Sequence, residues 1–566
     1  MRNLFLSASA MVLTTAAVAE PLKLDLTLTP QVSADAVTGW SVESRFDTAA
    51  GDPVMRFTIP KTLGPLQRIP DRLSHITARD DQGPLNLTPS DGTGYMGAPA
   101  QIFTTDRAPV GDVILSYQVA TSHETISGPN WELRPEGLGS SAQGSSILLL
   151  PDQEKPYEVS INWDLKQLPQ GARSITSYAR DPKTVTEPIS RLRQTYFMAG
   201  NLISTPDDLT TPSVFRAAST AINNHPQKPL LDWSSDAYTR MSGYFGFSSP
   251  PPFTVLMRSN IYGGTSGTAG PEGLIATMAP QASELGIKSL ISHEMVHVYL
   301  HGLMEADDSG RNPDAGWFTE GIAVYYQRRA PFMTGLFTPD QFLEDFNETA
   351  RAYYSNIRIN VPMSEAIKNF WTDPRQRIQP YNRGSMYFHV LDGQIRAKSA
   401  GKRTLDDVIR AYLKRHNDGL SVTDKDWMDL LVVELGPQAR TDFEAMMNGA
   451  VQVPSSDALG ICFKRVETQM PVFELGFEMS SLINRPRVIA GLDPASPAAK
   501  AGLKDGDVVT NTLIIDAIQD DPREPITLKI ERGGQKHDIT FSPQGHLTKG
   551  YLWQRVKGVA DKKCAV

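Results

Sequence analysis

The stretch ISHEMVHVYLHG, residues 291–302, has two histidines four positions apart, His293 and His297, with Glu294 directly after the first. On an α-helix, residues four apart lie about 40° apart around the axis, so both imidazoles can approach one metal ion. Glu294 lies at the margin of that face, where its carboxylate can reach a water molecule without binding the ion, as a general base must. A buried helix with two core histidines is the alternative.

A third metal ligand would distinguish these alternatives, because zinc takes about four ligands, with His nitrogens at about 2.0–2.1 Å. His301 continues the spacing, but residues eight apart on a straight helix lie about 12 Å apart along its axis. We therefore expect His301 at the helix end, not on the ion. Glu320, in GWFTEGIAVYY, stands at the start of a second predicted helix and would complete a His-His-Glu set. Compensation of the helix dipole is the alternative role for Glu320.

Three regions of different pattern must position these residues. Residues 20–204 alternate apolar and polar side chains between Gly, Pro and Asp turns, which predicts a β-rich, sandwich-like domain. Residues 205–457 pass from a strand and a Gly-rich turn into helical periodicity, which predicts a mixed α/β domain. Residues 458–566 return to short strands. We therefore predict a multidomain α+β protein, as expected for a chain of 566 residues.

The charge balance and the first residues exclude some classes of function. A net charge of −8 and a pI near 5.8 argue against nucleic acid as the partner. Residues 1–19 combine Arg2, an apolar stretch and a final Ala-Val-Ala, which is typical of a cleaved signal peptide. A buried N-terminal helix is the alternative. No segment has the apolar length of a membrane span, so we expect a periplasmic or secreted protein.

Two cysteines, Cys462 and Cys564, bracket most of the C-terminal region. In an oxidising compartment such a pair can form a disulfide that joins the two ends of the region. Two free thiols are the alternative, because the spacing alone does not show whether the two Cα atoms come close enough for a bridge.

The combination HEMVH and WFTEG resembles the gluzincin metallopeptidases, whose aminopeptidase members carry H-E-x-x-H followed by W-x-x-E-G. The segment between His297 and Glu320 is longer here, and its stretch MEADDSGRNPDAG has the composition of a loop insertion. PYNRGSMYFHVLDGQI resembles the Y-x-K-G segment of those enzymes. The resemblance implies one zinc ion on His293, His297 and Glu320, with Glu294 as general base and Tyr381 as donor to the oxyanion. An ordinary Tyr at a helix N-terminus is the alternative for Tyr381.

Residues 474–477, ELGF, and the stretch DPASPAAKAGLKDGDVV resemble the PDZ domains of bacterial secreted proteases. The resemblance implies that backbone N–H groups of Leu475, Gly476 and Phe477 receive the C-terminal carboxylate of a peptide. A packing module without a ligand is the alternative. A β-rich N-terminal domain, a thermolysin-like gluzincin domain and a PDZ-like β domain together resemble the glycyl aminopeptidase family.

One segment departs from that family. Its substrate strand corresponds here to YGGTSGTAG, in which Gly263 and Gly264 permit close backbone approach to a peptide. Thr265 and Ser266 stand where the family has a Glu that pairs with the free α-amine of the substrate, and Glu272 follows at a distance. We expect Gly263, Gly264 and Thr265 to lie alongside the peptide.

The sequence therefore predicts a secreted zinc-dependent peptidase that is aminopeptidase-like, with exo- or endopeptidase preference left open. A non-catalytic periplasmic protein that binds peptides or acts as a scaffold through its PDZ-like domain is the alternative. A third hypothesis is an enzyme with the same site that cleaves something other than peptides.

Overall fold

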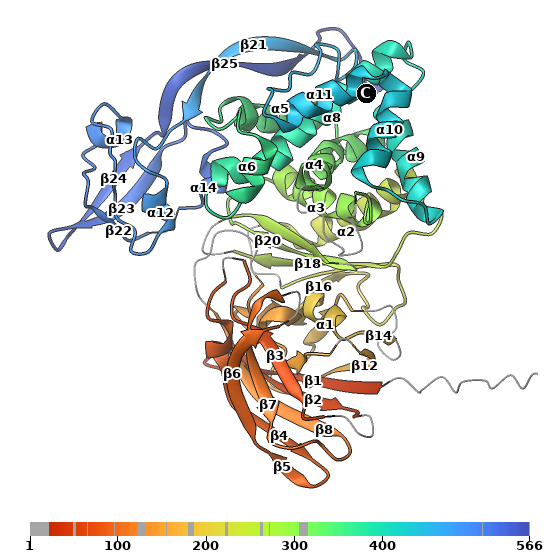
Figure 1. Cartoon of the computed structure of the whole chain (residues 1–566), viewed down its shortest axis with the longest axis vertical. Helices are drawn as coiled ribbons and strands as arrows, with labels where there is room; N and C mark the ends of the chain where they lie inside the picture. Colours follow the sequence, from red (N-terminus) through yellow and green to blue (C-terminus); the bar gives the residue numbers. More distant parts are fainter. Residues whose placement is uncertain are drawn as a thin grey trace, which may run out of the picture.

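The computed structural model shows a β-rich N-terminal part, a helical part and a small C-terminal module (Figure 1). The structure describes residues 22–48, 53–64, 66–94, 97–122, 131–153, 155–178, 186–220, 225–260, 264–270, 272–304, 315–511 and 513–564. The predicted signal peptide, residues 1–19, and Gly263 lie outside the described residues. Within the described part, no helix combines the length and the apolar character that a membrane span requires.

Three sheets build the N-terminal part, which confirms the predicted β-rich region. The seven-stranded sheet has the order β14-β12-β1-β2-β8-β4-β5, and the two four-stranded sheets have the orders β13-β15-β10-β9 and β11-β3-β7-β6. The strands are β1 (Leu22–Ser33), β2 (Ala36–Phe46), β3 (Arg56–Pro60), β4 (Leu73–Asp80), β5 (Gly83–Leu85), β6 (Leu87–Thr93), β7 (Pro99–Thr105), β8 (Val113–Ala120), β9 (Arg134–Glu136), β10 (Gly139–Gln143), β11 (Leu150–Pro151), β12 (Pro156–Trp163), β13 (Arg173–Thr176), β14 (Thr186–Pro188) and β15 (Tyr196–Gly200). Short helices accompany them: η1 (Ile69–Arg72), η3 (Gly144–Ser146) and α1 (Ser190–Gln194).

The two-residue alternation of β1 shows why these segments are strands. Leu24, Leu26 and Leu28 are buried in the N-terminal core, whereas Lys23 and Asp25 on the opposite face are exposed. Such alternation suits a sheet that buries one face only. β1 pairs with β12 in parallel and with β2 in antiparallel register, so it lies inside the sheet.

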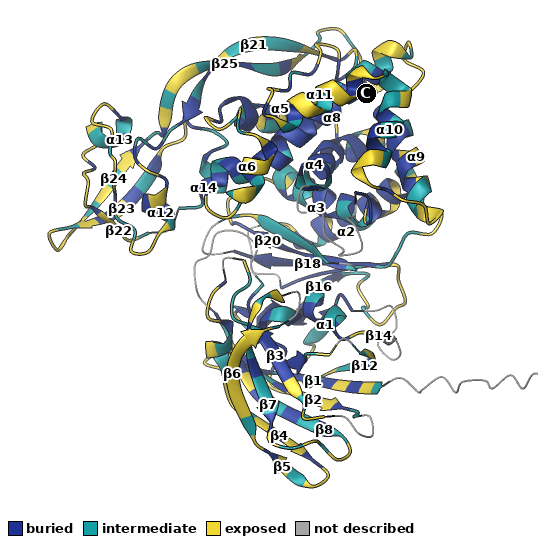
Figure 2. Ribbon diagram, in the orientation of Figure 1, coloured by how far each residue is buried: buried dark blue, intermediate teal, exposed yellow. Residues whose placement is uncertain are grey.

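A five-stranded sheet with the order β16-β17-β18-β20-β19 joins the N-terminal and helical parts. Its strands are β16 (Ile203–Thr205), β17 (Phe215–Ser219), β18 (Phe253–Ser259), β19 (Ser266–Gly270) and β20 (Gly273–Met278). Every residue of β18 and β20 is buried (Figure 2), because helices cover one face and the N-terminal part packs on the other. β17, β18 and β20 run parallel, whereas β19 is antiparallel to β20 and forms an edge of the sheet.

Helices form most of the chain between β20 and residue 447, as the helical periodicity predicts. They are α2 (Gln227–Tyr244), which precedes β18, and α3 (Glu284–Tyr299), α4 (Gly316–Met333), α5 (Pro339–Tyr354), α6 (Met363–Lys368), α7 (Pro374–Arg377), α8 (Gln379–Lys398), α9 (Leu405–Asn417), α10 (Asp424–Leu435) and α11 (Gln438–Met447). Ser283 caps α3 by accepting a hydrogen bond from the Gly286 N–H at 2.9 Å. The helix ends at Tyr299, so His301 lies beyond it and is exposed, as expected.

Helices α4 and α8 touch through their backbones at two glycines. A Cβ added to Gly321 would lie 2.6 Å from the Cα of Gly384. A Cβ added to Gly384 would lie 2.3 Å from the carbonyl oxygen of Trp317. Since Glu320 precedes Gly321 and Tyr381 lies about one turn before Gly384, this contact brings both side chains to one place.

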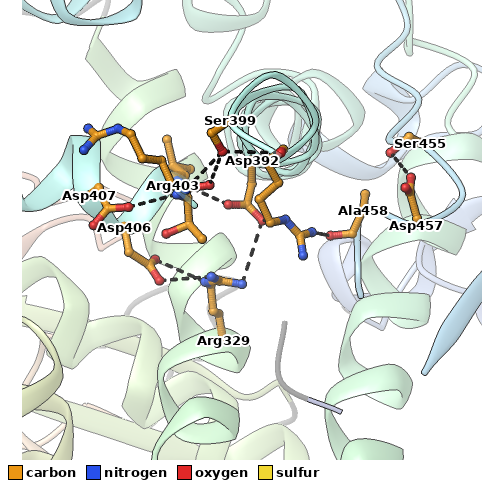
Figure 3. Close-up of polar contacts among 12 residues, drawn as sticks. Arg329, Asp392, Ser399, Arg403, Asp406, Asp407, Ser455, Asp457 and Ala458 are labelled. Atoms are coloured by element: carbon orange, nitrogen blue, oxygen red, sulfur yellow. Dashed lines mark hydrogen bonds and ion pairs between the residues drawn. The ribbon is translucent and has the colours of Figure 1, made fainter. Parts of the chain in front are cut away.

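Buried ion pairs hold α4 against the neighbouring helices. The Arg329 guanidinium contacts Asp406 of α9 at 2.9 Å and Asp392 of α8 at 3.9 Å (Figure 3). Burial acts to raise the pKa of Asp406, but Arg329 outweighs it and holds that pKa below its usual range. Arg328 pairs with Asp345 of α5. Removing one partner of such a buried pair strands a charge, at a cost of about 3–5 kcal/mol.

The last hundred residues form two structures. One is a ribbon that packs on the helical part, and the other is a small module with its own apolar core. The strands β21 (Phe463–Phe473) and β25 (Gln544–Arg555) form an antiparallel ribbon that packs on α5, with Trp553 against Phe346. Cys462 and Cys564 lie at the end of this ribbon with their Cα atoms 5.2 Å apart and form a disulfide. The bridge, and not the pair of free thiols, is therefore present, and α5 packs beside it.

Residues 474–543, named the C-terminal module here, extend from the far end of the ribbon (Figure 1). The elements of the module are α12 (Ser480–Ile483), α13 (Pro497–Lys500), β22 (Val508–Val509), α14 (Ile515–Ile518), β23 (Ile526–Arg532) and β24 (Gln535–Phe541). Its three strands form one sheet over a separate apolar core. The helix η5 (Asp561–Lys563) follows the ribbon.

The contact of α4 and α8 makes the substitution Gly384→Ala a test of how the helices are positioned. We expect it to lower the free energy of unfolding by about 1–3 kcal/mol, because the new methyl group overpacks two rigid backbones. Gly393→Ala on the same helix is the matched control, since its Cβ would meet the Ser455 hydroxyl at 3.2 Å. That change should stay within about 1 kcal/mol. Urea unfolding of both variants measures the difference, and equal stabilities would contradict a backbone contact.

Candidate active site

The two histidines of α3 and Glu320 of α4 converge on one point. The Nε2 atoms of His293 and His297 lie 3.2 Å apart. The Glu320 Oε2 atom lies 3.3 Å from Nε2 of His293 and 3.4 Å from Nε2 of His297. Ligand atoms about 2.0–2.2 Å from a tetrahedral ion lie about 3.3–3.5 Å from one another. The three donors therefore form one face of a tetrahedron of the size that zinc requires, and the set fits that ion.

The charges of this triad support a cation between the donors. Burial acts to lower the pKa of His297, but the Glu320 carboxylate outweighs it and raises the pKa to about 9. Burial conversely favours a higher pKa for Glu320, yet the two imidazoles hold it well below its usual range. Glu320 therefore stays ionised beside the imidazoles, as a metal-binding carboxylate must.

A second layer of side chains orients the first histidine. The Nδ1 atom of His293 lies 3.2 Å from Oε1 of Gln327, which is about two helical turns after Glu320 on α4. The Gln327 amide in turn donates to the Asp345 carboxylate of α5 at 3.2 Å. With the hydrogen of His293 on Nδ1, Nε2 is free to bind a metal ion, and the glutamine fixes that tautomer.

Glu294 is buried, and its carboxylate lies against the edge strand β19. A Cβ added to Gly267 of β19 would lie 2.5 Å from Oε1 of Glu294, so only glycine leaves room for this carboxylate. The backbone of Ala269 also hydrogen-bonds to Glu294. Burial raises the pKa of Glu294, and Glu320 adds to this, while the two histidines oppose it. The carboxylate thus lies between β19 and the metal ligands without belonging to them.

Tyr381 comes to the same site from α8. Its ring stacks beside that of His293, with centroids 6.1 Å apart and an interplanar angle of 16°. Burial raises the pKa of Tyr381 well above its usual value, and the charges of Glu320, Glu294 and Asp516 add to this. The phenol therefore stays protonated and able to donate a hydrogen bond.

The described residues of the predicted substrate segment, Gly264 and Thr265, lie directly before the strand β19. Gly264 and Thr265 lie in the turn before β19, where the Gly264 carbonyl accepts from Asn260 Nδ2 at 2.9 Å. The Thr265 hydroxyl accepts from the Ala279 N–H at 3.1 Å. Among the described strands, β19 pairs with β20 alone, so it lies at the edge of the five-stranded sheet. Glu272, the acid that follows, pairs with Arg191 at 3.0 Å and faces the N-terminal part.

Sequence reasoning missed the residues that support the site. Gln327 carries no motif of its own, and its role follows only from the meeting of α3, α4 and α5. Gly267 and Ala269 were visible as part of a run of small residues, which is the one available signal for a backbone that other groups approach closely.

The loop of residues 474–477 belongs to the C-terminal module. Leu475 and Phe477 are buried in the module core, and Gly476 has a φ of +81°. In the part of the chain that the structure describes, the backbone N–H groups of these three residues donate to no acceptor. The loop is followed by the helix α12 and not by a strand.

One solved structure shares the fold of this chain over nearly its whole length. No protein-family model matches the chain, and neither does any curated protein. Among solved structures, an aminopeptidase N family protein from Idiomarina loihiensis matches with a TM-score of 0.66 and 12% identity, over 94% of this chain and 98% of that one. An M1 zinc metallopeptidase from Deinococcus radiodurans gives a TM-score of 0.44 at 16% identity, over 77% and 96%. A yeast LTA4 hydrolase gives 0.44 at 15% identity, over 75% and 67%. The chain thus shares the fold of the Idiomarina protein along nearly its whole length.

Gln327→Ala tests whether the hydrogen bond to His293 serves a metal ion. We expect it to weaken zinc binding about 10–100-fold, because the imidazole loses the partner that fixes its tautomer and orientation. Titration with zinc against a competing chelator measures the affinity. Gln394→Ala on α8, whose amide faces Asp442, is the control and should bind zinc like the unmodified protein. Unchanged affinity in Gln327→Ala would contradict the assignment.

Proposed function

We propose that this protein is a zinc-dependent peptidase of the gluzincin type. The observation that carries the proposal is the face of three donor atoms, 3.2–3.4 Å apart, with the buried carboxylate of Glu294 between it and an open sheet edge. Two satisfied core histidines would not need two acids beside them, Glu320 and the buried Glu294. The fold shared with an aminopeptidase N family protein supports the same function.

The chain's own residues supply the proton transfers and the binding of the peptide. His293, His297 and Glu320 would hold one zinc ion, which polarises a carbonyl group and lowers the pKa of water toward neutrality. Glu294 accepts a proton from the attacking water and returns it to the leaving amine, and its raised pKa suits both steps. The protonated phenol of Tyr381 donates a hydrogen bond to the oxygen on which negative charge develops.

The edge strand β19 supports a peptide substrate. A free edge offers backbone N–H and C=O groups with which an extended peptide can pair as an additional strand. Its sequence, Ser-Gly-Thr-Ala-Gly, carries no large side chain that would hold a peptide away. Because Glu294 contacts Gly267 of this strand, a peptide paired with β19 passes directly by the general base.

The type of peptidase depends on how the substrate's N-terminus is bound. Thr265 has no carboxylate, and the carboxylate of Glu272 is paired with Arg191, so neither residue offers an unpaired negative charge to an α-amine. We propose an aminopeptidase-like enzyme. Residues outside the segment 263–272 would decide whether it accepts peptides with a blocked N-terminus.

The rival function is that of a peptide-binding or scaffold protein acting through the C-terminal module. Three unpaired N–H groups at Leu475, Gly476 and Phe477 favour a carboxylate ligand there, in the manner of a PDZ domain. The helix α12 stands directly after the loop, where an added peptide would need a strand as partner. The observations therefore favour the peptidase over this rival.

Glu294→Ala, compared with the unmodified protein on a mixture of free and N-acetylated peptides, tests the peptidase. We expect hydrolysis to fall about 10²–10⁴-fold because the general base is lost. Zinc content should not change, since Glu294 is no ligand. Mass spectrometry identifies the products and elemental analysis the zinc. Glu284→Ala, an exposed acid in the first turn of the same helix, is the control and should keep full activity.

The products distinguish the remaining hypotheses. Stepwise trimming of free N-termini alone would define an aminopeptidase, and internal cuts in acetylated peptides would define an endopeptidase. Equal treatment of the peptides by the unmodified protein and Glu294→Ala would refute the peptidase. In that case, binding of peptides with a free C-terminal carboxylate, but not of their amides, would establish the rival.

We further propose that the protein is exported and loses residues 1–19. The Cys462–Cys564 disulfide supports this, because such bonds persist in oxidising compartments. After expression in a bacterium, the protein recovered from the periplasm should begin at Glu20, as read by N-terminal sequencing. A cytoplasmic product with an intact N-terminus would contradict export.

A further inference from the structure

The C-terminal module returns to the active site through one short segment, residues 513–518. Its helix α14 contacts α7, the helix that directly precedes α8 and Tyr381. Figure 1 shows α14 beside the helical part, whereas α12, α13 and the sheet of the module lie farther out. A segment distant in sequence from the motifs of His293, Glu320 and Tyr381 therefore borders the site.

Ile514, directly before α14, covers the turn that leads into β19. A Cβ added to Gly264 would lie 2.6 Å from Cδ1 and 3.6 Å from Cγ2 of Ile514. Gly264 has a φ of +73°, which suits glycine, and its carbonyl is held by Asn260. The turn is thus fixed from both sides, and the isoleucine stands at the end of the edge strand where β19 begins.

An ion pair holds this segment in place. Arg377 of α7 and Asp516 of α14 form a two-pronged contact, with Nη2–Oδ2 at 2.7 Å and Nε–Oδ1 at 3.2 Å. The Arg377 Nη1 atom also donates to the Phe370 carbonyl at 3.1 Å, which orients the guanidinium. Such paired hydrogen bonds fix geometry as well as contributing energy. Because Arg377 lies four residues before Tyr381, the pair ties the module to the catalytic helix.

Ile514 is not needed for the module to fold. The apolar core of the module includes Ile515 and the partly buried Leu513 and Ile518, but Ile514 is not among its members. Its side chain instead leaves the module and contacts the catalytic part. A side chain that packs across such a boundary, at the entrance to a substrate strand, is placed to select substrates.

We infer that Ile514 is a specificity-determining residue of the active site, positioned by the Arg377–Asp516 pair. The inference rests on the proposed peptidase function. A peptide paired with β19 brings one of its side chains toward Ile514, whose branched apolar body limits the space there. The site should therefore prefer a small apolar residue at that one position of the peptide and reject bulky ones.

Ile514→Ala and Ile514→Trp in the full-length protein test the inference. The measurement is kcat/KM for peptides that carry Gly, Ala, Leu or Phe at each position around the cleaved bond. Ile514→Ala should raise the ratio for Phe over Ala about tenfold or more at one position, and Ile514→Trp should lower it. Val508→Ala, an exposed residue of the same module, should leave all ratios unchanged. Ratios unchanged at every position in both Ile514 variants would overturn the inference.

Charge exchange tests the ion pair without relying on activity alone. Arg377→Asp and Asp516→Arg should each speed hydrogen exchange in residues 513–518 and relax the selectivity, and the double variant should restore both. Exchange as slow in the single variants as in the unmodified protein would overturn the positioning role. If the unmodified protein binds zinc but cleaves no peptide, the proposed function fails, and the exchange data still decide whether the pair holds the segment.

Discussion

The site depends on one close contact, the meeting of α4 and α8 at Gly321 and Gly384. Helices normally keep axes about 8–10 Å apart because side chains stand between them. Here neither helix has a side chain at the crossing, so a carboxylate ligand from one and a phenol from the other can share one site. The glycines of the two motifs WFTEG and YNRG are thus parts of one contact, although more than sixty positions separate them.

Polar side chains then fix the orientation that the contact permits. Gln327, Arg328 and Arg329 follow one another on α4 and reach α3, α5, α8 and α9. The first of them orients a metal ligand, and the other two anchor the helix through buried charges. Because these polar groups are buried, a helix shift that separated one of them from its partner would leave an unpaired polar group or charge in the core. The pairs therefore restrict how the helices can move. Such a framework is suited to hold three donor atoms at the spacing of one ion.

The edge strand joins the metal site to the rest of the molecule. Glu294 packs against the backbone of Gly267, so the proposed general base and the strand proposed to bind a peptide are in direct contact. The turn before that strand touches Ile514 of the C-terminal module, which reaches it from the far end of a long ribbon. All three regions of the chain therefore meet around β19, with Arg191 of the N-terminal part bound to Glu272 behind it.

The sequence by itself determined the chemistry of the site. Helical spacing alone places His293 and His297 on one face, and the nature of the donors selects a metal, because both features are local. Glu320 and Tyr381 were found through the motifs WFTEG and YNRG. The motifs do not show that the two helices that carry them touch. The β-rich start and helical middle followed from periodicity in the same local way.

Only the tertiary structure decided which distant residues support that chemistry. Gln327 and Ile514 carry no local signal, since their roles arise from neighbours that lie far away in the sequence. The sequence predicts that Gly263, Gly264 and Thr265 lie alongside the peptide, and only the pairing of β19 with β20 shows that the strand after them is an edge of the sheet. Strand pairing and a disulfide between residues 102 positions apart both join segments that are distant in the sequence. Neither can be read from a local pattern, because both depend on how the whole chain folds.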